Sequence, residues 1–277
     1  MRKAYSAMKY VCIAALVISI IALVAVVAYV LINGVDKLSL NLVFGEYTDS
    51  APTLFPALVG TLQIVCIAAI IAVPIGVASA IFLVEYTNNK GKFAKIVQVA
   101  TETLAGIPSI VYGLFGYLIF VVAFGWGYSM LGGGITLAIM ILPTIVRSTQ
   151  ESLLSVQEGL REGSYALGAS KVRTIFKIVL PSCAGGIVTS IILAIGRVVS
   201  ESAVLILTVG MVVNKVPETL MAPGTSLALD IYYFASHGYP DEAAATAVVL
   251  LIFVIFLNLL ASFIGKMIKK STYGDTK

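Results

Sequence analysis

Residues 158–181 read EGLREGSYALGASKVRTIFKIVLP, and they stand between two long apolar stretches of the chain. The segment predicts a short amphipathic helix over Glu158–Leu167, in which charged and apolar residues separate onto different faces. Gly168 is expected to end this helix with a positive φ, which glycine adopts at little steric cost. A second helix is predicted over Ala169–Val179, with Pro181 beyond its end. Two short helices joined at a glycine corner would form a compact knob.

The apolar stretches on either side of the knob are long enough to cross a membrane. Of the 277 residues, 59% are hydrophobic and 12% charged, and the mean hydropathy is +1.02. Soluble domains usually carry about twice that charge, whereas a bilayer core needs about 20 apolar residues per helix. The predicted spans are Val11–Ile32, Leu58–Val84, Leu104–Phe124, Gly134–Val146 (extended to Met130 and beyond Arg147), Ala184–Val213 and Ala243–Ile264. The predicted fold class is an all-α, six-helix polytopic membrane protein.

Basic residues are distributed unevenly between the two predicted sides of the membrane. Of the 18 Lys and Arg residues, 15 fall on the side that holds both termini and the knob, whereas the other side has only Lys37 and Lys215. The positive-inside rule therefore places both termini in the cytoplasm. The long segments 33–57 and 214–242 would then face outwards, and loops of that length are usually functional or loosely ordered.

Two charged residues fall inside the predicted fifth span. Arg197 is expected near its middle, with Glu201 one turn further on, on a face of small and polar residues that includes Gly186, Ser190, Ala194 and Thr208. A charge at a helix centre costs roughly 2.5–3.5 kcal/mol on insertion scales, so such residues face a protein interior or a wet cavity. Two interpretations stay open. Arg197 and Glu201 could form a structural ion pair, or Arg197 could line an anion pathway, since guanidinium donates paired hydrogen bonds to phosphate.

The composition disfavours several function classes. The motif Gly-x-x-x-x-Gly-Lys-[Ser/Thr] does not occur, so the chain cannot bind ATP by that motif. The single histidine, His237, falls outside the spans, which leaves no base for an intramembrane serine protease and no His-Glu-x-x-His for a zinc protease. No basic run interleaved with aromatic residues suggests nucleic acid. A channel or an ion-coupled transporter remains an alternative, although no inverted repeat is evident.

The knob resembles the "EAA" signature of permease subunits in bacterial ABC importers. The matching residues are Glu162, Gly168, Ile178, Leu180 and Pro181, and the departure is Gly163-Ser164 where the family has two alanines. The resemblance implies the type I ABC importer fold, in which this loop is the coupling helix that docks on a separate ATP-binding subunit.

The knob's surface admits two interpretations. In the first, an apolar set enters a groove of the partner, and Arg161, Glu162 and Arg173 lie on its rim. The apolar set comprises Leu160, Tyr165, Ala166, Leu167 and Phe176. In the second, the knob is an amphipathic connector that lies at the membrane interface.

Further motifs resemble the phosphate-specific permeases of this family, the PstA-type subunit in particular. They are residues 74–76, 85–86, 106–115, 142–149, 160–168 and 196–203. Arg147, with Glu151 one turn on, matches a second family arginine near the inner exit; it could equally be a positive-inside anchor. The resemblance covers residues 57–266. It implies a permease domain there, preceded by a tail, span and outer loop in 1–56 and followed by a cytoplasmic tail in 267–277, disordered from Ser271.

The resemblance also implies a substrate and partners. The substrate would be inorganic phosphate, with molybdate, sulfate or phosphonate as alternatives that the knob does not discriminate. The partners would be a second homologous permease subunit, two cytoplasmic ATP-binding subunits and an extracytoplasmic phosphate-binding protein. The chain itself would bind no cofactor, because ATP is used by the partner subunit.

Overall fold

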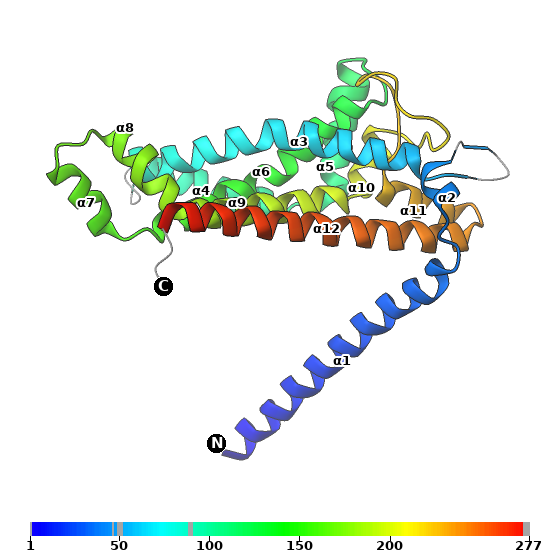
Figure 1. Cartoon of the computed structure of the whole chain (residues 1–277), viewed down its shortest axis with the longest axis horizontal. Coiled ribbons are helices and arrows are strands. Elements are labelled where there is room, and N and C mark those ends of the chain that lie inside the picture. Colours follow the sequence, from blue (N-terminus) through cyan, green and yellow to red (C-terminus); the bar gives the residue numbers. More distant parts are fainter. Residues whose placement is uncertain (1, 46, 49–51, 88–90, 274–277) are drawn as a thin grey trace.

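The computed structural model describes residues 2–45, 47–48, 52–87 and 91–273, which are almost entirely helical (Figure 1). In chain order its elements are α1 (Arg2–Val35), α2 (Leu40–Phe44), α3 (Phe55–Ile81), the π-helical η1 (Phe82–Tyr86), α4 (Lys92–Ala105), α5 (Ser109–Gly116), the π-helical η2 (Tyr117–Ala123), α6 (Met130–Leu154), α7 (Glu158–Ala166), α8 (Lys171–Thr174), the π-helical η3 (Ile175–Val179), α9 (Leu180–Val199), α10 (Ala203–Thr208), α11 (Leu227–Ser236) and α12 (Pro240–Tyr273). Among the described residues, five helices are long and apolar enough to cross a membrane, or six if one bent pair is a single span. The predicted all-α polytopic fold is confirmed.

α6 is the central helix of the bundle, and most of its span is buried. It begins after Ser129, whose hydroxyl accepts a hydrogen bond from the Gly132 N–H at 3.2 Å and so satisfies a free donor of the first turn. Glycines let α6 and α3 approach closely, since a Cβ on Gly134 would meet Ile67 and a Cβ on Gly76 would meet Ile145. α9 packs on another side of α6, and α12 packs on α9.

α1 diverges from this bundle along most of its length (Figure 1). Its side chains from Met8 onward are mostly exposed. It meets α12 near its C-terminal end, where Gly34 packs on Ala244 and Val248. Lys37, just beyond the helix, forms an ion pair with Asp241 at 2.9 Å between Nζ and Oδ2.

The third predicted span is bent rather than straight. Residues 94–105 and 109–123 are both helical, but their axes differ by 98°. The bend falls at Pro108, which lacks an N–H and disfavours helical geometry in the residue before it. The prediction of a continuous helix over Leu104–Phe124 is therefore wrong.

The predicted boundary between the knob and the fifth span is also wrong. α8, η3 and α9 form a continuous helical span from Lys171 to Val199, so Pro181 lies inside it rather than beyond a helix end. The π-helical η3 ends at Val179, two residues before Pro181, and the Leu180 N–H donates to the carbonyl of Ile175. This wider turn accommodates a residue that has no N–H and crowds the turn before it.

Segment 214–242 folds back onto the bundle instead of being loosely ordered. α11 packs against α12 and α3, and the Leu227 N–H donates to Thr61 Oγ1 at 2.9 Å. Asp230 is fully buried, and the Thr225 hydroxyl donates to its Oδ1. The other carboxyl oxygen, Oδ2, is buried without a hydrogen-bond partner among the described residues. Burial raises the pKa of Asp230 to about 7, because the charged form loses its hydration.

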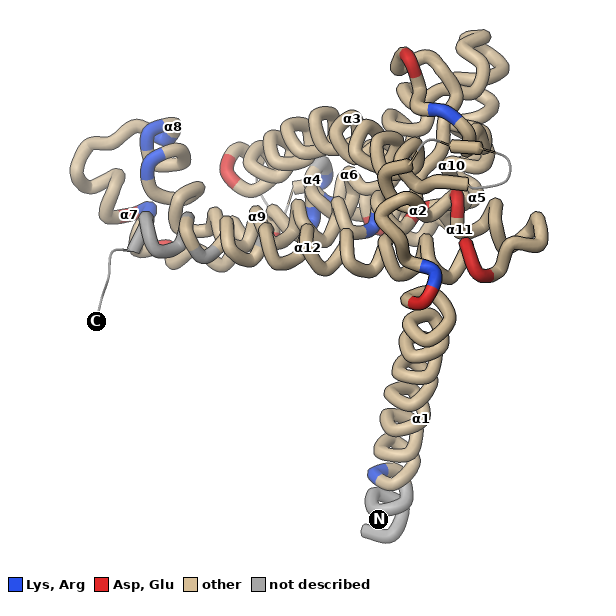
Figure 2. Tube along the Cα trace, turned by 45° about the vertical axis from the view of Figure 1, so that its right-hand side comes forward, with Lys and Arg blue, Asp and Glu red and all other residues tan. Residues whose placement is uncertain are grey.

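Charged residues lie at the two ends of the molecule (Figure 2). Basic residues of α8 lie at the end that holds the knob, and acidic residues of α11 and α12 lie at the opposite end. α12 continues to Tyr273, so residues 271–273 are helical where a disordered tail was predicted. Residues 274–277 lie outside the described part of the chain.

Asp230→Asn is expected to remove a pH dependence from the lobe that α11 forms with α3 and α12. The folded lobe keeps its proton up to about pH 7, whereas an unfolded aspartate ionises near pH 3.8. The wild-type lobe is therefore most stable below about pH 4 and loses stability as pH rises to about 7. The ratio of the packed lobe to the opened lobe, in which Asp230 is in water, falls by at most about tenfold per pH unit.

The rate at which a thiol reagent modifies a cysteine at buried Ala228 would measure this opening, in a background without Cys12, Cys66 and Cys183. The ratio of the rates measured with and without the Asp230→Asn change cancels the intrinsic pH dependence of the thiol. A ratio that stays constant between about pH 5 and pH 7 would contradict the prediction.

Candidate functional site

Arg197 lies in the last turn of α9, not at the middle of a continuous helix. The helix ends at Val199, and residues 200–202 separate it from α10. A cation in this position interacts favourably with the helix dipole. The side chain is exposed, and its guanidinium has no hydrogen bond or ion pair within the described residues. An unpaired charge on a membrane-spanning helix is stable only where water, a ligand or another subunit reaches it.

Glu201 caps α10, and no ion pair between it and Arg197 is present in the described structure, which contradicts the first of the two interpretations. Its Oε1 accepts hydrogen bonds from the N–H groups of Ala203 at 3.1 Å and Val204 at 3.4 Å. These are free donors at a helix start, which a carboxylate satisfies well. The sequence Ser-Glu-Ser ahead of a short apolar run is a helix-start signal that could have predicted this role.

The break between α9 and α10 lies beside the bend between α4 and α5. α5 packs on α10, and a Cβ on Gly113 would come within 3.0 Å of the Val204 Cα. At the bend, the Tyr112 hydroxyl donates to the Leu104 carbonyl at 2.8 Å and satisfies an acceptor at the end of α4. Two helix interruptions therefore meet next to Arg197.

Three residues of the small and polar face predicted for the fifth span are buried between helices, whereas Gly186 is exposed. Ser190 and Ala194 are buried, Thr208 packs against glycines of α5 and α6, and a Cβ on Gly186 would meet Ser152. Small residues of this kind allow membrane helices to approach closely. The structure thus assigns Ser190, Ala194 and Thr208 to helix packing, and Arg197 is an exposed charged group at that helix end.

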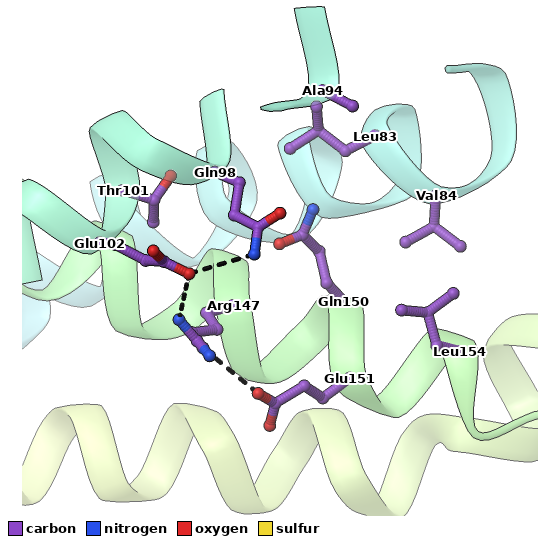
Figure 3. A pocket seen from close by; sticks show the side chains of 10 residues that line it. All are labelled: Leu83, Val84, Ala94, Gln98, Thr101, Glu102, Arg147, Gln150, Glu151 and Leu154. Carbon is purple, nitrogen blue, oxygen red and sulfur yellow. Dashed lines mark hydrogen bonds and ion pairs between the residues drawn. The ribbon is translucent and has the colours of Figure 1, made fainter. Parts of the chain in front are cut away.

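Arg147 lines a cavity of about 290 Å³ between α4, α6 and η1 (Figure 3). Its Nη1 lies 3.0 Å from Oε1 of Glu102, and its Nε lies 3.3 Å from Oε1 of Glu151. Gln98 Nε2 donates to the same oxygen of Glu102 at 3.1 Å. Two carboxylates therefore compensate the guanidinium charge, and the three charged side chains are about half exposed or more. Glu102 was not foreseen from the sequence, because it comes from another helix.

The knob presents its apolar side chains to the outside. Leu167 is 90% exposed and Phe176 is 61% exposed, and Leu160 and Tyr165 are also exposed. Gly168 has a φ of +80°, which confirms the predicted left-handed corner. No atom lies within 4 Å of the position that a Cβ would occupy there. Glu162 and Arg173 are exposed beside these side chains.

Other residues assigned to the docking surface are oriented differently. Ile178, Leu180 and Pro181 are half-buried at the root of the knob, inside the span that runs from Lys171 to Val199. Arg161 is buried and points back towards the bundle, so its predicted place on the rim is wrong.

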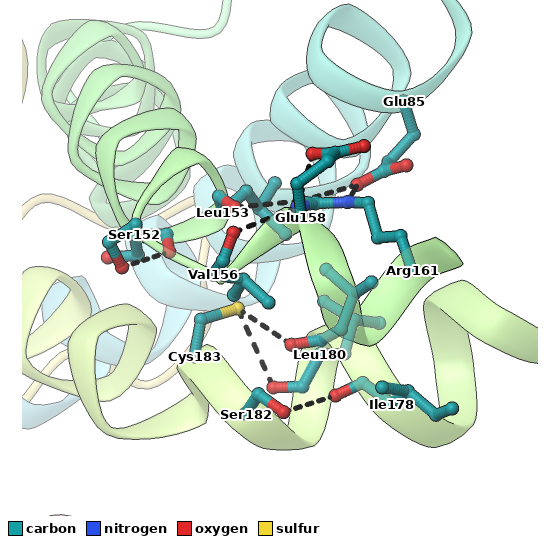
Figure 4. Close-up of polar contacts among 12 residues, drawn as sticks. Glu85, Ser152, Leu153, Val156, Glu158, Arg161, Ile178, Leu180, Ser182 and Cys183 are labelled. Atoms are coloured by element: carbon teal, nitrogen blue, oxygen red, sulfur yellow. Dashed lines mark hydrogen bonds and ion pairs between the residues drawn. The ribbon is translucent and has the colours of Figure 1, made fainter. Parts of the chain in front are cut away.

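Arg161 is held by groups from three elements (Figure 4). Its Nε and Nη2 donate to Oε1 of Glu85, at 3.2 and 3.1 Å. Its Nη1 donates to the carbonyl of Val156, just beyond α6, at 3.0 Å, and its Nη2 donates to the carbonyl of Leu153, in the last turn of α6, at 2.9 Å. A buried arginine must be paired in this way, because an unpaired buried charge is strongly unfavourable.

Comparison with known proteins places this geometry in a family. Residues 72–272 match the family described as "Binding-protein-dependent transport system inner membrane component". The probable ABC transporter permease protein YqgI of Bacillus subtilis is 34% identical over 90% of each chain. The phosphate transport system permease protein PstA of Yersinia pestis is 37% identical over 84% of this chain and 80% of that protein. PstA 1 of Mycobacterium tuberculosis (strain CDC 1551 / Oshkosh) is 36% identical over 76% and 70%.

Solved structures share the fold. A bacterial alginate ABC transporter, in complex with an alginate pentasaccharide-bound periplasmic protein, superposes with a TM-score of 0.69 at 15% identity, over 93% of this chain and 95% of that chain. The inward-facing MetNI methionine ABC transporter gives a TM-score of 0.64 at 20% identity, over 76% and 93%. At these identities the likeness concerns the fold alone.

Replacing Glu201 with alanine is expected to destabilise the protein by about 0.5–2 kcal/mol, the usual cost of losing a helix cap. Because Glu201 does not contact Arg197, the variants Arg197→Gln and Glu201→Ala should act additively, within about 0.5 kcal/mol. Denaturant unfolding of the two single variants and the double variant in detergent measures this coupling. A coupling energy above about 1 kcal/mol would show that the two charges form an ion pair after all.

Proposed function

Because the chain belongs to the family of binding-protein-dependent transport system inner membrane components, we propose that this ABC importer permease moves inorganic phosphate, driven by ATP that a separate subunit hydrolyses. The chain is a multi-pass inner-membrane protein. Phosphate as the substrate is supported by the PstA relatives, which cover most of the chain at 33–37% identity.

The observation that carries the proposal is the exposed guanidinium of Arg197, which lies beside two helix interruptions and has no ion pair among the described residues. Interrupted helices supply backbone groups and space for a ligand within the membrane. A guanidinium donates paired hydrogen bonds to a phosphate oxygen pair, and it keeps its charge at any physiological pH. In this proposal Arg197 binds the anion transiently on its path, and Glu201 supports it indirectly by holding α10 in place.

Arg147 would serve the anion nearer the exit. Its guanidinium is already compensated by Glu102 and Glu151, so an anion there gains less than at Arg197. Weak binding suits an exit, because a site that releases its ligand must not hold it tightly. In the alternative role, Arg147 only ties α4 to α6 through Glu102.

The knob would dock on a cytoplasmic ATP-binding subunit. Its exposed Leu167, Phe176, Leu160 and Tyr165 form an apolar set on a membrane protein's polar end, and such a set suits insertion into a groove. The proposed assembly has a second homologous permease subunit, two ATP-binding subunits and an extracytoplasmic phosphate-binding protein. Both termini would lie in the cytoplasm, on the side that carries most of the basic residues.

Arg197→Gln is expected to reduce phosphate uptake at least about tenfold while the complex still assembles, because the neutral side chain loses the charge-assisted hydrogen bonds. Arg197→Lys should retain part of the activity, since lysine keeps the positive charge but lacks the planar guanidinium that donates paired hydrogen bonds. Lys215→Gln, which removes an exposed basic residue of segment 214–242, is the matched control and should transport normally.

The measurement is uptake of labelled phosphate by the reconstituted complex, normalised to assembled protein, with unlabelled molybdate, sulfate and phosphonate as competitors. Normal uptake by Arg197→Gln would refute the pathway role. Competition by one of the other oxyanions at lower concentration than by phosphate would reassign the substrate.

Gly168→Val should weaken docking of the ATP-binding subunit, because a β-branched residue rarely adopts positive φ and the corner would open. Gly168→Asn is the matched control, since asparagine tolerates this conformation and the surrounding space is empty. Co-purification of the ATP-binding subunit should fall at least about tenfold for valine and less than about threefold for asparagine. Equal yields for valine and wild type would show that the corner is not required for docking.

A further inference from the structure

η1, the π turn at the end of α3, contacts both short helices of the knob. Glu85 of η1 accepts two hydrogen bonds from Arg161 of α7. The neighbouring Tyr86 lies under the ammonium group of Lys171 of α8, at 4.8 Å from Nζ to the ring centroid. Two consecutive residues of η1, at the end of one span, therefore contact both α7 and α8.

The contact between Glu85 and Arg161 is dry and has a defined geometry. Their side chains are 6% and 9% exposed. The guanidinium also donates to the carbonyls of Leu153, in the last turn of α6, and of Val156, just beyond it, so one side chain of α7 joins η1 to the end of α6. Glu158 contacts the same guanidinium at 3.3 Å, but its side chain is 72% exposed and water can replace it.

The inner face of α7 is polar rather than apolar. The buried residues of α7 are Arg161 and Ser164, and Ser164 shares a hydrogen bond of 2.8 Å with Thr174 of α8. Apolar side chains can shift past one another at little cost, whereas the charge-assisted hydrogen bonds from a guanidinium to a carboxylate require both partners in one arrangement. A displacement of α7 would therefore move η1 and the end of α6 with it. The hydrogen bond between Ser164 and Thr174 would move α8 as well.

We propose that η1 is the element that receives the movement of the knob, with Glu85 and Arg161 as the positioning residues that transmit it to α3 and α6. This inference rests on the proposed docking of an ATP-binding subunit on the knob. The apolar outer face would bind the subunit, and the polar inner face would transmit its movement. Docking and transmission are thereby assigned to different residues and can be separated by mutation.

The test uses the full reconstituted complex with phosphate and its binding protein. Glu85→Gln keeps the size of the side chain but removes its charge, and Glu158→Gln is the matched control on the same arginine. Three quantities are measured: co-purification of the ATP-binding subunit, ATP hydrolysis, and phosphate transported per ATP hydrolysed. We expect Glu85→Gln to retain the ATP-binding subunit and to lose at least about tenfold in phosphate transported per ATP, whereas Glu158→Gln stays within about twofold.

A second variant separates transmission from simple charge balance. Glu85→Met/Arg161→Met removes both buried charges, and replacement of a buried pair by apolar residues usually preserves folding. This variant is expected to assemble and to dock the ATP-binding subunit, yet to remain uncoupled. Coupling restored by the double variant, or normal coupling in Glu85→Gln, would overturn the inference.

The proposed function fails in a different way. If the wild-type chain does not retain the ATP-binding subunit, or retains it equally after Leu167→Ser/Phe176→Ser, then docking on the knob is wrong. If docking holds and Glu85→Gln couples like the wild type, only the role of η1 is wrong.

Discussion

Backbone hydrogen bonding in the absence of water is the constraint on which the rest of this structure depends. In a bilayer each unsatisfied N–H or C=O costs several kcal/mol, so a span can be interrupted only where side chains or neighbouring helices satisfy the free groups. The chain meets this requirement at both interruptions. Tyr112 donates to the end of α4, and Glu201 accepts from the start of α10. These local solutions allow two broken helices to meet beside Arg197.

Arg147, Arg161 and Arg197 differ in how their charges are balanced. Arg161 is buried and fully paired, and Arg147 is half exposed and paired with two carboxylates. Arg197 is exposed and has no ion pair within the described residues. A paired guanidinium stabilises the arrangement of its partners, whereas an unpaired one is available to a ligand. The same residue type thus supports a structural link in one place and a proposed anion pathway in another.

The knob reverses the usual arrangement of a surface helix. Its apolar side chains face outwards, and the inner face of α7 is held by Arg161 and Ser164. Exposed apolar residues would be unfavourable on an isolated surface, so they imply a covering partner. The polar inner contacts give the knob a fixed orientation on the ends of α3 and α6. The proposed docking of an ATP-binding subunit on the knob would account for both features.

The sequence predicted those features that depend on a single segment of the chain. Runs of apolar residues gave the spans because bilayer crossing depends on length and hydropathy, and Gly168 gave the corner because only glycine adopts a positive φ readily. The end of α9 at Val199 and the partners of Arg161 and Glu201 were decided by the tertiary structure. Arg161 binds Glu85, 76 residues earlier in the chain, because α3 packs on α6 and brings both ends to the same place. Composition and spacing within one segment cannot encode such a contact, since it depends on how separate helices pack.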